Sequence, residues 1–257
     1  MLYSWENTTR QVREAAPAVA LLPVAAMEPH GDHLPVGSKV IILDVIARLL
    51  AEQLPDAVYL LPTLPMGTSD LHMGSSGAIA LSWQTMTAAV RDLVESLLCQ
   101  GIHRVVVLPG LGLASAGRVR PSENYVIKTA VRQLNYDHPD LQAIWVQPLS
   151  VAAEQLKAIF ETAEAEVQAG EVVTSLMLHL APGLVKPQAT DNVPGAPRQY
   201  LDYARFEAIC PEGVWGYPSK ASAEKGARAL DAAVHSTVSY VTNSFEHLAR
   251  MKLSYTY

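Results

Sequence analysis

The chain has 257 residues, of which 49% are hydrophobic and 17% are charged, so it can bury a core and is too apolar for wholesale disorder. Its 19 basic and 25 acidic residues give a net charge of −6, which argues against nucleic acid as the main partner because phosphate binding needs a basic face. No apolar run reaches the roughly 18 residues of a membrane span, no secretory signal opens the sequence, and two cysteines do not make a disulfide framework, so we expect a cytoplasmic protein without a membrane partner.

Short apolar runs alternate with helical patterns along the chain. In chain order the patterns predict a strand over 18–26, a helix over 40–54, a strand over 57–61, a helix over 83–100, a strand over 104–108, a helix over 123–135, a strand over 143–146, helices over 152–169 and 173–180, a loop over 181–198 and a long helix or helix pair over 221–250. Such alternation is typical of a mostly parallel sheet covered on both faces. We therefore expect one α/β domain over residues 1–257.

One loop carries an unusual density of polar side chains. Residues 27–35 read MEPHGDHLP and place Glu28, His30, Asp32 and His33 directly after a predicted buried strand. Carboxylates and imidazoles at this spacing are typical of metal sites, although a polar turn with hydrogen-bonded histidines would show the same pattern. The loops after parallel strands usually form the functional site of such a sheet.

The segment around this loop resembles the opening motif of the creatininase (creatinine amidohydrolase) family. Residues 22–37 read LPVAAMEPHGDHLPVG, where the family has LPxGSxEQHGPHLPxGTD. Segments 66–82, 101–112, 168–185 and 213–226 resemble later family motifs in the same order. The resemblance implies a three-layer α/β/α sandwich with a mostly parallel central sheet and a ring-like homo-oligomer, often a hexamer. It also implies hydrolysis of C–N bonds in small amides, lactams or formamides at two divalent metals such as zinc or manganese.

The family's metal ligands are only partly present. Its first glutamate and histidine fall on Glu28 and His30, but its bridging aspartate falls on Lys39. The histidine of the family's NGHGGN motif falls on Leu111, and a further glutamate ligand of the creatininase branch falls on Leu113. An ammonium repels a dication and leucine cannot coordinate one. We therefore expect no metal cofactor, with Glu28 and His30 as weak candidates for a single ion.

Two further family positions, the histidine and glutamate of HAGxxE, fall on Gln168 and Val173. Asp44 is a possible replacement for the bridging acid, but it lies about 140° around the predicted helix from Lys39. We expect the Lys39 ammonium to pair with Glu28 close to a family metal position; the alternative is that Lys39 points into solvent.

The candidate site residues follow from the loop and from the family motifs. The candidates for catalysis are Glu28, His30, Lys39 and His72. Ser69 and His33 are candidates for substrate binding, although the family counterpart of His33 more often orders the loop.

Three functions remain open from the sequence. The first is a metal-independent enzyme or binder that acts on a small amide-, lactam- or carboxylate-bearing molecule, for which Lys39 favours an anionic ligand. The second is a non-catalytic pseudoenzyme or assembly subunit, in which Leu111, Leu113 and Val173 fill the former metal cavity. The third is a residual amidohydrolase that uses one metal.

Overall fold

A computed structural model describes residues 1–111 and 122–251 of the chain. In these residues one sheet contains β1 (Leu2–Ser4), β2 (Val19–Val24), β3 (Val58–Leu60), β4 (Arg104–Pro109) and β5 (Gln142–Trp145). The strand order is β1-β3-β2-β4-β5, and every pairing is parallel. The parallel sheet predicted from the alternating pattern is confirmed, and the short strand β1 is an addition.

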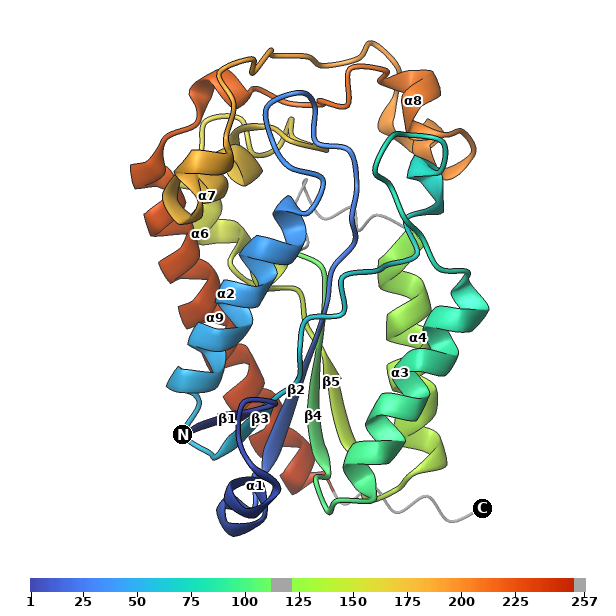
Figure 1. The fold of residues 1–257 in the computed structure, drawn as a ribbon, viewed down its shortest axis with the longest axis vertical. Helices are drawn as coiled ribbons and strands as arrows, with labels where there is room; N and C mark the ends of the chain where they lie inside the picture. Colours follow the sequence, from blue (N-terminus) through green and yellow to red (C-terminus); the bar gives the residue numbers. More distant parts are fainter. Residues whose placement is uncertain (112–121, 252–257) are drawn as a thin grey trace.

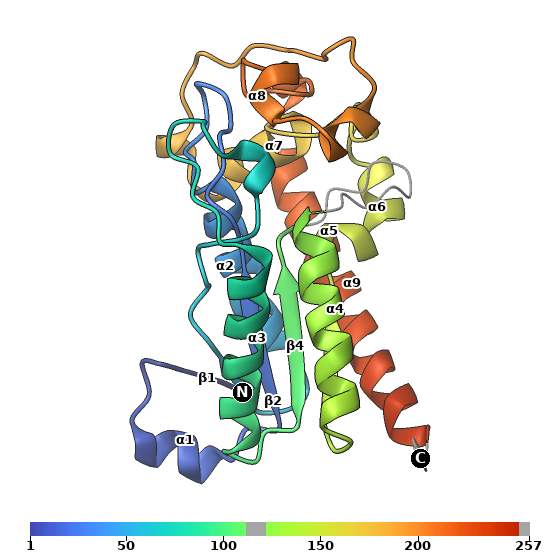
Figure 2. The same cartoon turned by 90° about the vertical axis from the view of Figure 1, so that its right-hand side faces the viewer.

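Helices cover both faces of this sheet. The α-helices are α1 (Thr9–Ala15), α2 (Ser38–Gln53), α3 (Trp83–Leu98), α4 (Ser122–Asp137), α5 (Pro148–Val151), α6 (Ala153–Lys157), α7 (Glu171–Leu180), α8 (Phe206–Ile209) and α9 (Ala223–Arg250). Short 3-10 helices are η1 (Asp70–His72), η2 (Pro182–Leu184), η3 (Arg198–Asp202) and η4 (Pro218–Lys220). Helices α2 and α9 lie on one face and α3 and α4 on the other, which gives the predicted three layers (Figure 1). Figure 2 shows α3 and α4 on the near face.

Strand β2 explains why both faces must be covered. All six of its residues, VALLPV, are buried. Successive side chains of a strand point to opposite faces, and accordingly Leu21 packs in the core beneath α2, α7 and α9, whereas Leu22 packs beneath α3 and α4. A strand that is apolar on both sides is stable only between two layers of helices.

The helix predicted over 152–169 is wrong beyond its first turns. Within that range only the short α6 forms, and the chain leaves the helical path after Lys157. The buried carboxylate of Glu166 accepts hydrogen bonds from backbone N–H groups of Gly170, Val172 and Val173. A side chain that binds nearby backbone in this way competes with helix formation, so the acidic residues that suggested a helical surface belong to a loop.

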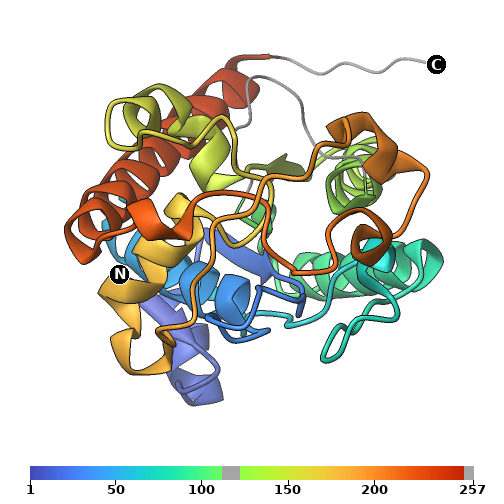
Figure 3. The ribbon, with the colours of Figure 1, turned by 90° about the horizontal axis from the view of Figure 1, so that it is seen from above.

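The carboxyl ends of the parallel strands meet at one end of the molecule, where the long connections gather (Figure 3). The loops after β2 and β3, and the segment that leads into α7, come together at this end. No helix in residues 1–111 or 122–251 has the length and apolar character needed to cross a membrane.

The free edge of β5 is covered by a side chain. Asn135 donates from Nδ2 to the carbonyl oxygen of Ala143 over 2.9 Å, and the N–H of Ala143 donates to Oδ1 over 2.8 Å. An open sheet edge is a template for pairing with another chain, so the amide of Asn135 blocks an extra strand at this position.

We expect Asn135→Ala to lower the free energy of unfolding by about 1–3 kcal/mol, because it leaves two backbone groups without their partner. We also expect the variant to self-associate as its concentration rises. Chemical denaturation and sedimentation velocity test the two effects. Gln133→Ala is the matched control, since Gln133 lies on the same helix and donates to the side chain of Asp137 rather than to the sheet edge. Identical sedimentation of the two variants would contradict the role of Asn135.

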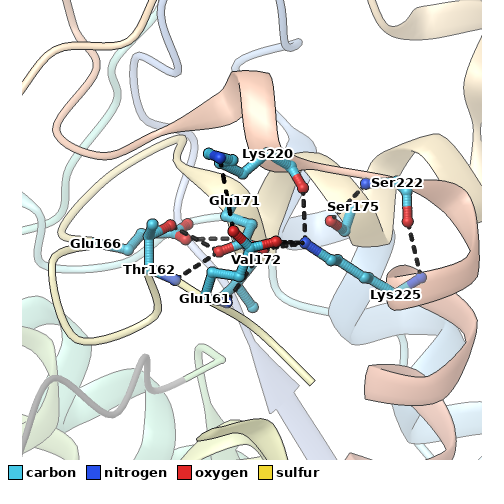
Figure 4. Close-up of polar contacts among 9 residues, drawn as sticks. All are labelled: Glu161, Thr162, Glu166, Glu171, Val172, Ser175, Lys220, Ser222 and Lys225. Atoms are coloured by element: carbon cyan, nitrogen blue, oxygen red, sulfur yellow. Dashed lines mark hydrogen bonds and ion pairs between the residues drawn. The ribbon is translucent and has the colours of Figure 1, made fainter. Parts of the chain in front are cut away.

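A buried ion pair joins α7 to α9. Lys225 donates to Oε1 of Glu171 over 2.6 Å, and the Glu171 side chain has no exposed surface (Figure 4). Burial acts to raise the pKa of Glu171, but hydrogen bonds from Lys225 and Thr162 outweigh it and hold that pKa below its ordinary value of 4.5. Glu171 therefore stabilises the folded state above pH 4.5, and this stability is lost as the pH falls through the lowered pKa.

Glu171→Gln is expected to destabilise the protein most near neutral pH and progressively less below pH 4.5, because the wild type loses the same contribution there. Urea denaturation of both proteins between neutral and acidic pH measures the difference in free energy of unfolding. A difference that stays constant with pH would show that the ion pair does not titrate as described.

Candidate functional site

The residues expected to form a site converge at the carboxyl end of the sheet. Glu28 and His30 lie on the loop after β2, Lys39 lies in the first turn of α2, and Ser69 and His72 belong to the turn at η1. This turn follows β3, the neighbour of β2 in the sheet. Parallel strands that end at one edge thus bring together side chains far apart in the sequence.

Glu28 is the centre of this cluster, and only 3% of its surface is exposed. Lys39 donates from Nζ to Oε2 of Glu28, and Ser69 donates from Oγ to Oε1. Nε2 of Gln168 donates to Oε2 over 3.0 Å, while Nε2 of His72 lies 3.6 Å from the same oxygen. The expected pairing of Lys39 with Glu28 is present, and the structure adds Gln168 to the site.

The ammonium of Lys39 determines the charge state of Glu28. Burial acts to raise the pKa of this carboxyl, but the charge of Lys39, followed by those of His72 and His30, holds the pKa well below its ordinary value. Glu28 is therefore ionised at neutral pH and balances the positive charge of Lys39. A carboxylate with so low a pKa is a weak general base.

His30 and His33 differ in their surroundings. Nδ1 of His30 lies 2.8 Å from the carbonyl oxygen of Glu28, which assigns the proton to Nδ1 and leaves Nε2 as an acceptor. Burial and the nearby charge of Lys39 lower the pKa of His30 to about 3, so the ring is neutral. Nε2 of His33 instead lies 3.0 Å from Oγ1 of Thr174 on α7, which ties the loop to that helix rather than to Glu28.

Two buried acceptors near Glu28 have no hydrogen-bond partner among residues 1–111 and 122–251. They are Nε2 of His30 and Oε1 of Gln168. The Gln168 amide is oriented by its Nε2 group, which donates to both Glu28 and the carbonyl oxygen of Pro29. Buried polar groups are normally hydrogen-bonded, so these two acceptors suit a ligand that carries N–H groups.

The residues do not fit the two divalent metals of the family. Lys39 places its ammonium on Glu28, and the side chains of Leu111 and Val173 are buried in the apolar core. Asp44 is exposed and accepts a hydrogen bond from Thr63, so it does not replace the bridging acid. No group of three or more His, Cys, Asp or Glu side chains within the described ranges is arranged to hold a metal ion. Leu113 lies outside the described residues.

A cavity of about 370 Å³ opens beside His30. Its polar lining includes Asp32, Glu207 and Glu212, together with Ser75 and Ser76. Ser75 donates to Glu207 over 3.2 Å. The carboxylates of this lining favour ligand groups that donate hydrogen bonds over groups that carry negative charge.

Comparison of the sequence with known proteins identifies the family of this chain. The family model described as creatininase, creatinine amidohydrolase, matches residues 5–241. The chain belongs to the creatininase family. A mycofactocin precursor peptide peptidase of Mycobacterium ulcerans (strain Agy99) is 26% identical over 246 residues, which are 91% of this chain and 88% of that protein. A creatinine amidohydrolase of Pseudomonas putida is 26% identical over 259 residues, covering 94% and 95%.

The fold of this creatininase-family chain also matches solved structures. A structure described as "Creatininase Mn" superimposes with a TM-score of 0.76 at 22% identity, covering 95% of this chain and 99% of the other. The three-layer architecture implied by the sequence motifs is thereby confirmed. Glu28 and His30, the residues of this chain that resemble the start of the family motif, lie on the loop directly after β2.

Proposed function

We propose that this creatininase-family protein binds a small neutral molecule with an amide or lactam group, and that it does so without metal. The ion pair between Lys39 and Glu28 carries the proposal. It puts a fixed cation beside the carboxylate that the family motif offers to a metal, and it leaves the cluster close to neutral.

The polar groups around Glu28 complement an amide. An ammonium has three N–H donors, and the contacts within the described ranges direct one of them to Glu28. The Lys39 side chain retains 15% exposure, so it can offer a donor to a carbonyl oxygen. His30 lines the neighbouring cavity, and its Nε2 acceptor suits an N–H group of the same ligand.

The charges favour a neutral ligand over the anionic one expected from the sequence. Glu28 already offsets the charge of Lys39, and the neighbouring cavity presents three carboxylates. A carboxylate-bearing molecule would meet repulsion from Asp32, Glu207 and Glu212, whereas an amide or lactam would not. The names of the relatives, a precursor peptide peptidase and a creatinine amidohydrolase, also refer to molecules that contain such bonds.

The same site residues argue that the protein binds its ligand but does not hydrolyse it with two metals. In two-metal sites the ions polarise the carbonyl group and lower the pKa of a bound water. Here Lys39 and Leu111 stand at ligand positions, and the lowered pKa of Glu28 makes it a poor base. The second candidate function is that of a subunit in a larger assembly that binds no small molecule. The burial of Leu111 and Val173 in the core favours this function.

Two measurements test the proposal, the first on protein that has not met a chelator and the second on EDTA-treated protein. Elemental mass spectrometry after purification with zinc and manganese is expected to find almost no metal. Ligand-detected NMR then compares N-acetylglycinamide, 2-pyrrolidinone and creatinine with the carboxylate N-acetylglycine, and we expect saturable binding of the neutral probes alone. Lys39→Met should abolish that binding, whereas Lys157→Met, which breaks an exposed ion pair, should retain it.

Three outcomes would overturn the proposal. About two tightly bound ions per chain would support a metal-dependent hydrolase instead. Preference for N-acetylglycine would reverse the inferred ligand charge. Failure of every probe to bind the metal-free wild type would favour the assembly subunit.

A further inference from the structure

Gln168, which contacts Glu28 from the segment before α7, belongs to a loop whose backbone is hydrogen-bonded by one of its own side chains. Glu166 lies two residues before it and has no exposed surface. Its Oε1 accepts from the backbone N–H of Gly170 over 3.0 Å and of Val173 over 3.2 Å, and its Oε2 accepts from Val172 over 2.6 Å. Figure 4 shows Glu166 beside Val172 at the start of α7.

The loop is folded tightly around this carboxylate. Ala169 has a φ of +52°, which a residue other than glycine adopts rarely. A Cβ atom on Gly170 would lie 2.8 Å from Cδ of Glu166, so glycine is required for the close approach. The unfavourable backbone at Ala169 is maintained because three N–H groups are satisfied by one side chain.

The other side of the loop is held by a separate segment. The N–H of Trp215 donates to the carbonyl oxygen of Gln168 over 2.9 Å, and the N–H of Gln168 donates back over 3.2 Å. With its backbone fixed on both sides, the Gln168 side chain can reach Glu28 over 3.0 Å and the carbonyl oxygen of Pro29 over 2.8 Å.

We infer that Glu166 is a positioning residue, which sets the amide of Gln168 against Glu28 by organising residues 166–173. Glu166 does not touch Glu28 in any contact of the described residues; it acts through the loop. The inference deepens the proposed function. It rests on that function only for the statement that the site binds a ligand, because the orientation of Gln168 can be measured without one.

The neighbouring Glu171 provides a matched control. It is also buried and also lies at the start of α7, but its partners are Lys225 and the residues 161 and 162 (Figure 4). Neutralising either glutamate removes one negative charge from the same helix end. Of these two glutamates, Glu166 accepts from Gly170, Val172 and Val173 next to Gln168, whereas Glu171 accepts from the earlier loop residues 161 and 162.

The experiment follows the side-chain amide of Gln168 in ¹H–¹⁵N spectra of the full chain. The resonance is assigned by its loss in Gln168→Ala. Burial raises the pKa of Glu166 to about 7, so spectra are recorded at pH 9, where the carboxylate is ionised. In Glu166→Gln one acceptor oxygen is replaced by a donor, and we expect the Gln168 amide signals to move to the position of a solvated glutamine. In Glu171→Gln they should remain at the wild-type position.

A second variant covers the case in which Glu166→Gln does not fold. Gly170→Ala keeps the charge of Glu166 but pushes against its carboxyl group, and it should displace the same signals. Wild-type positions of the Gln168 signals in a folded Glu166→Gln or Gly170→Ala variant would overturn the inference, and so would an equal displacement in Glu171→Gln. Displaced signals together with a wild type that binds no amide probe would uphold the positioning role and refute the proposed function.

Discussion

Lys39→Met is expected to lower the free energy of unfolding by about 3–5 kcal/mol, the cost of leaving one charge of a buried ion pair without its partner. Glu28 is 3% exposed and, without the ammonium, would be left with the neutral donors of Ser69 and Gln168. Urea denaturation at neutral pH measures the loss. The double variant Glu28→Gln with Lys39→Met should recover much of it, since a neutral pair does not bury an uncompensated charge.

Lys157→Met is the control for this prediction. Lys157 pairs with Glu154 at 2.9 Å, but the two side chains are 44% and 83% exposed. Exposed pairs contribute about 0–1 kcal/mol, so the control should unfold close to the wild type. If the two lysine variants lost equal stability, the pair at Glu28 would not be buried as described.

Gly226→Ala is expected to cost about 3 kcal/mol or more, at the upper end of the range for overpacked cores. A Cβ at this position would lie 2.0 Å from the carbonyl oxygen of Ser175 and 2.6 Å from its carbonyl carbon. Both atoms belong to the backbone of α7, so the clash cannot be relieved by a change of rotamer. Helices α7 and α9 would have to move apart where Gly226 meets Ser175.

Gly183→Ala serves as the comparison, because a Cβ there meets no atom within 4 Å and the residue is exposed. Surface substitutions of this kind usually change stability by less than about 0.5 kcal/mol. Thermal and urea denaturation of both variants test the contrast. Wild-type stability of Gly226→Ala would mean that the two helices approach less closely than the structure shows.

The sequence predicted the sheet well because burial on both faces leaves a clear pattern. The continuous apolar runs of β2 and β4 indicate strands covered by helices. The pairing of Glu28 with Lys39 could also be predicted, since both positions belong to one family motif. Strand β1, with three residues, and α8, with four, are too short to produce a periodic pattern.

Long-range side-chain contacts were the part that the sequence could not predict. Gln168 lies 140 positions from Glu28, and only the folded chain shows that its amide donates to that carboxylate. The same limit explains the mistaken helix over 152–169. Its polar residues fit a solvated helical face, but Glu166 is buried and binds the backbone of a loop.

The ion pair at Glu28 also limits which acidic substitutions this site tolerates. A single change of Lys39 to aspartate would place two carboxylates side by side, while Leu111 and Val173 still fill the adjacent core with apolar side chains. Like charges in a buried setting repel strongly, so this variant would be less stable than the wild type. An acidic residue at position 39 therefore requires compensating changes among the residues around it.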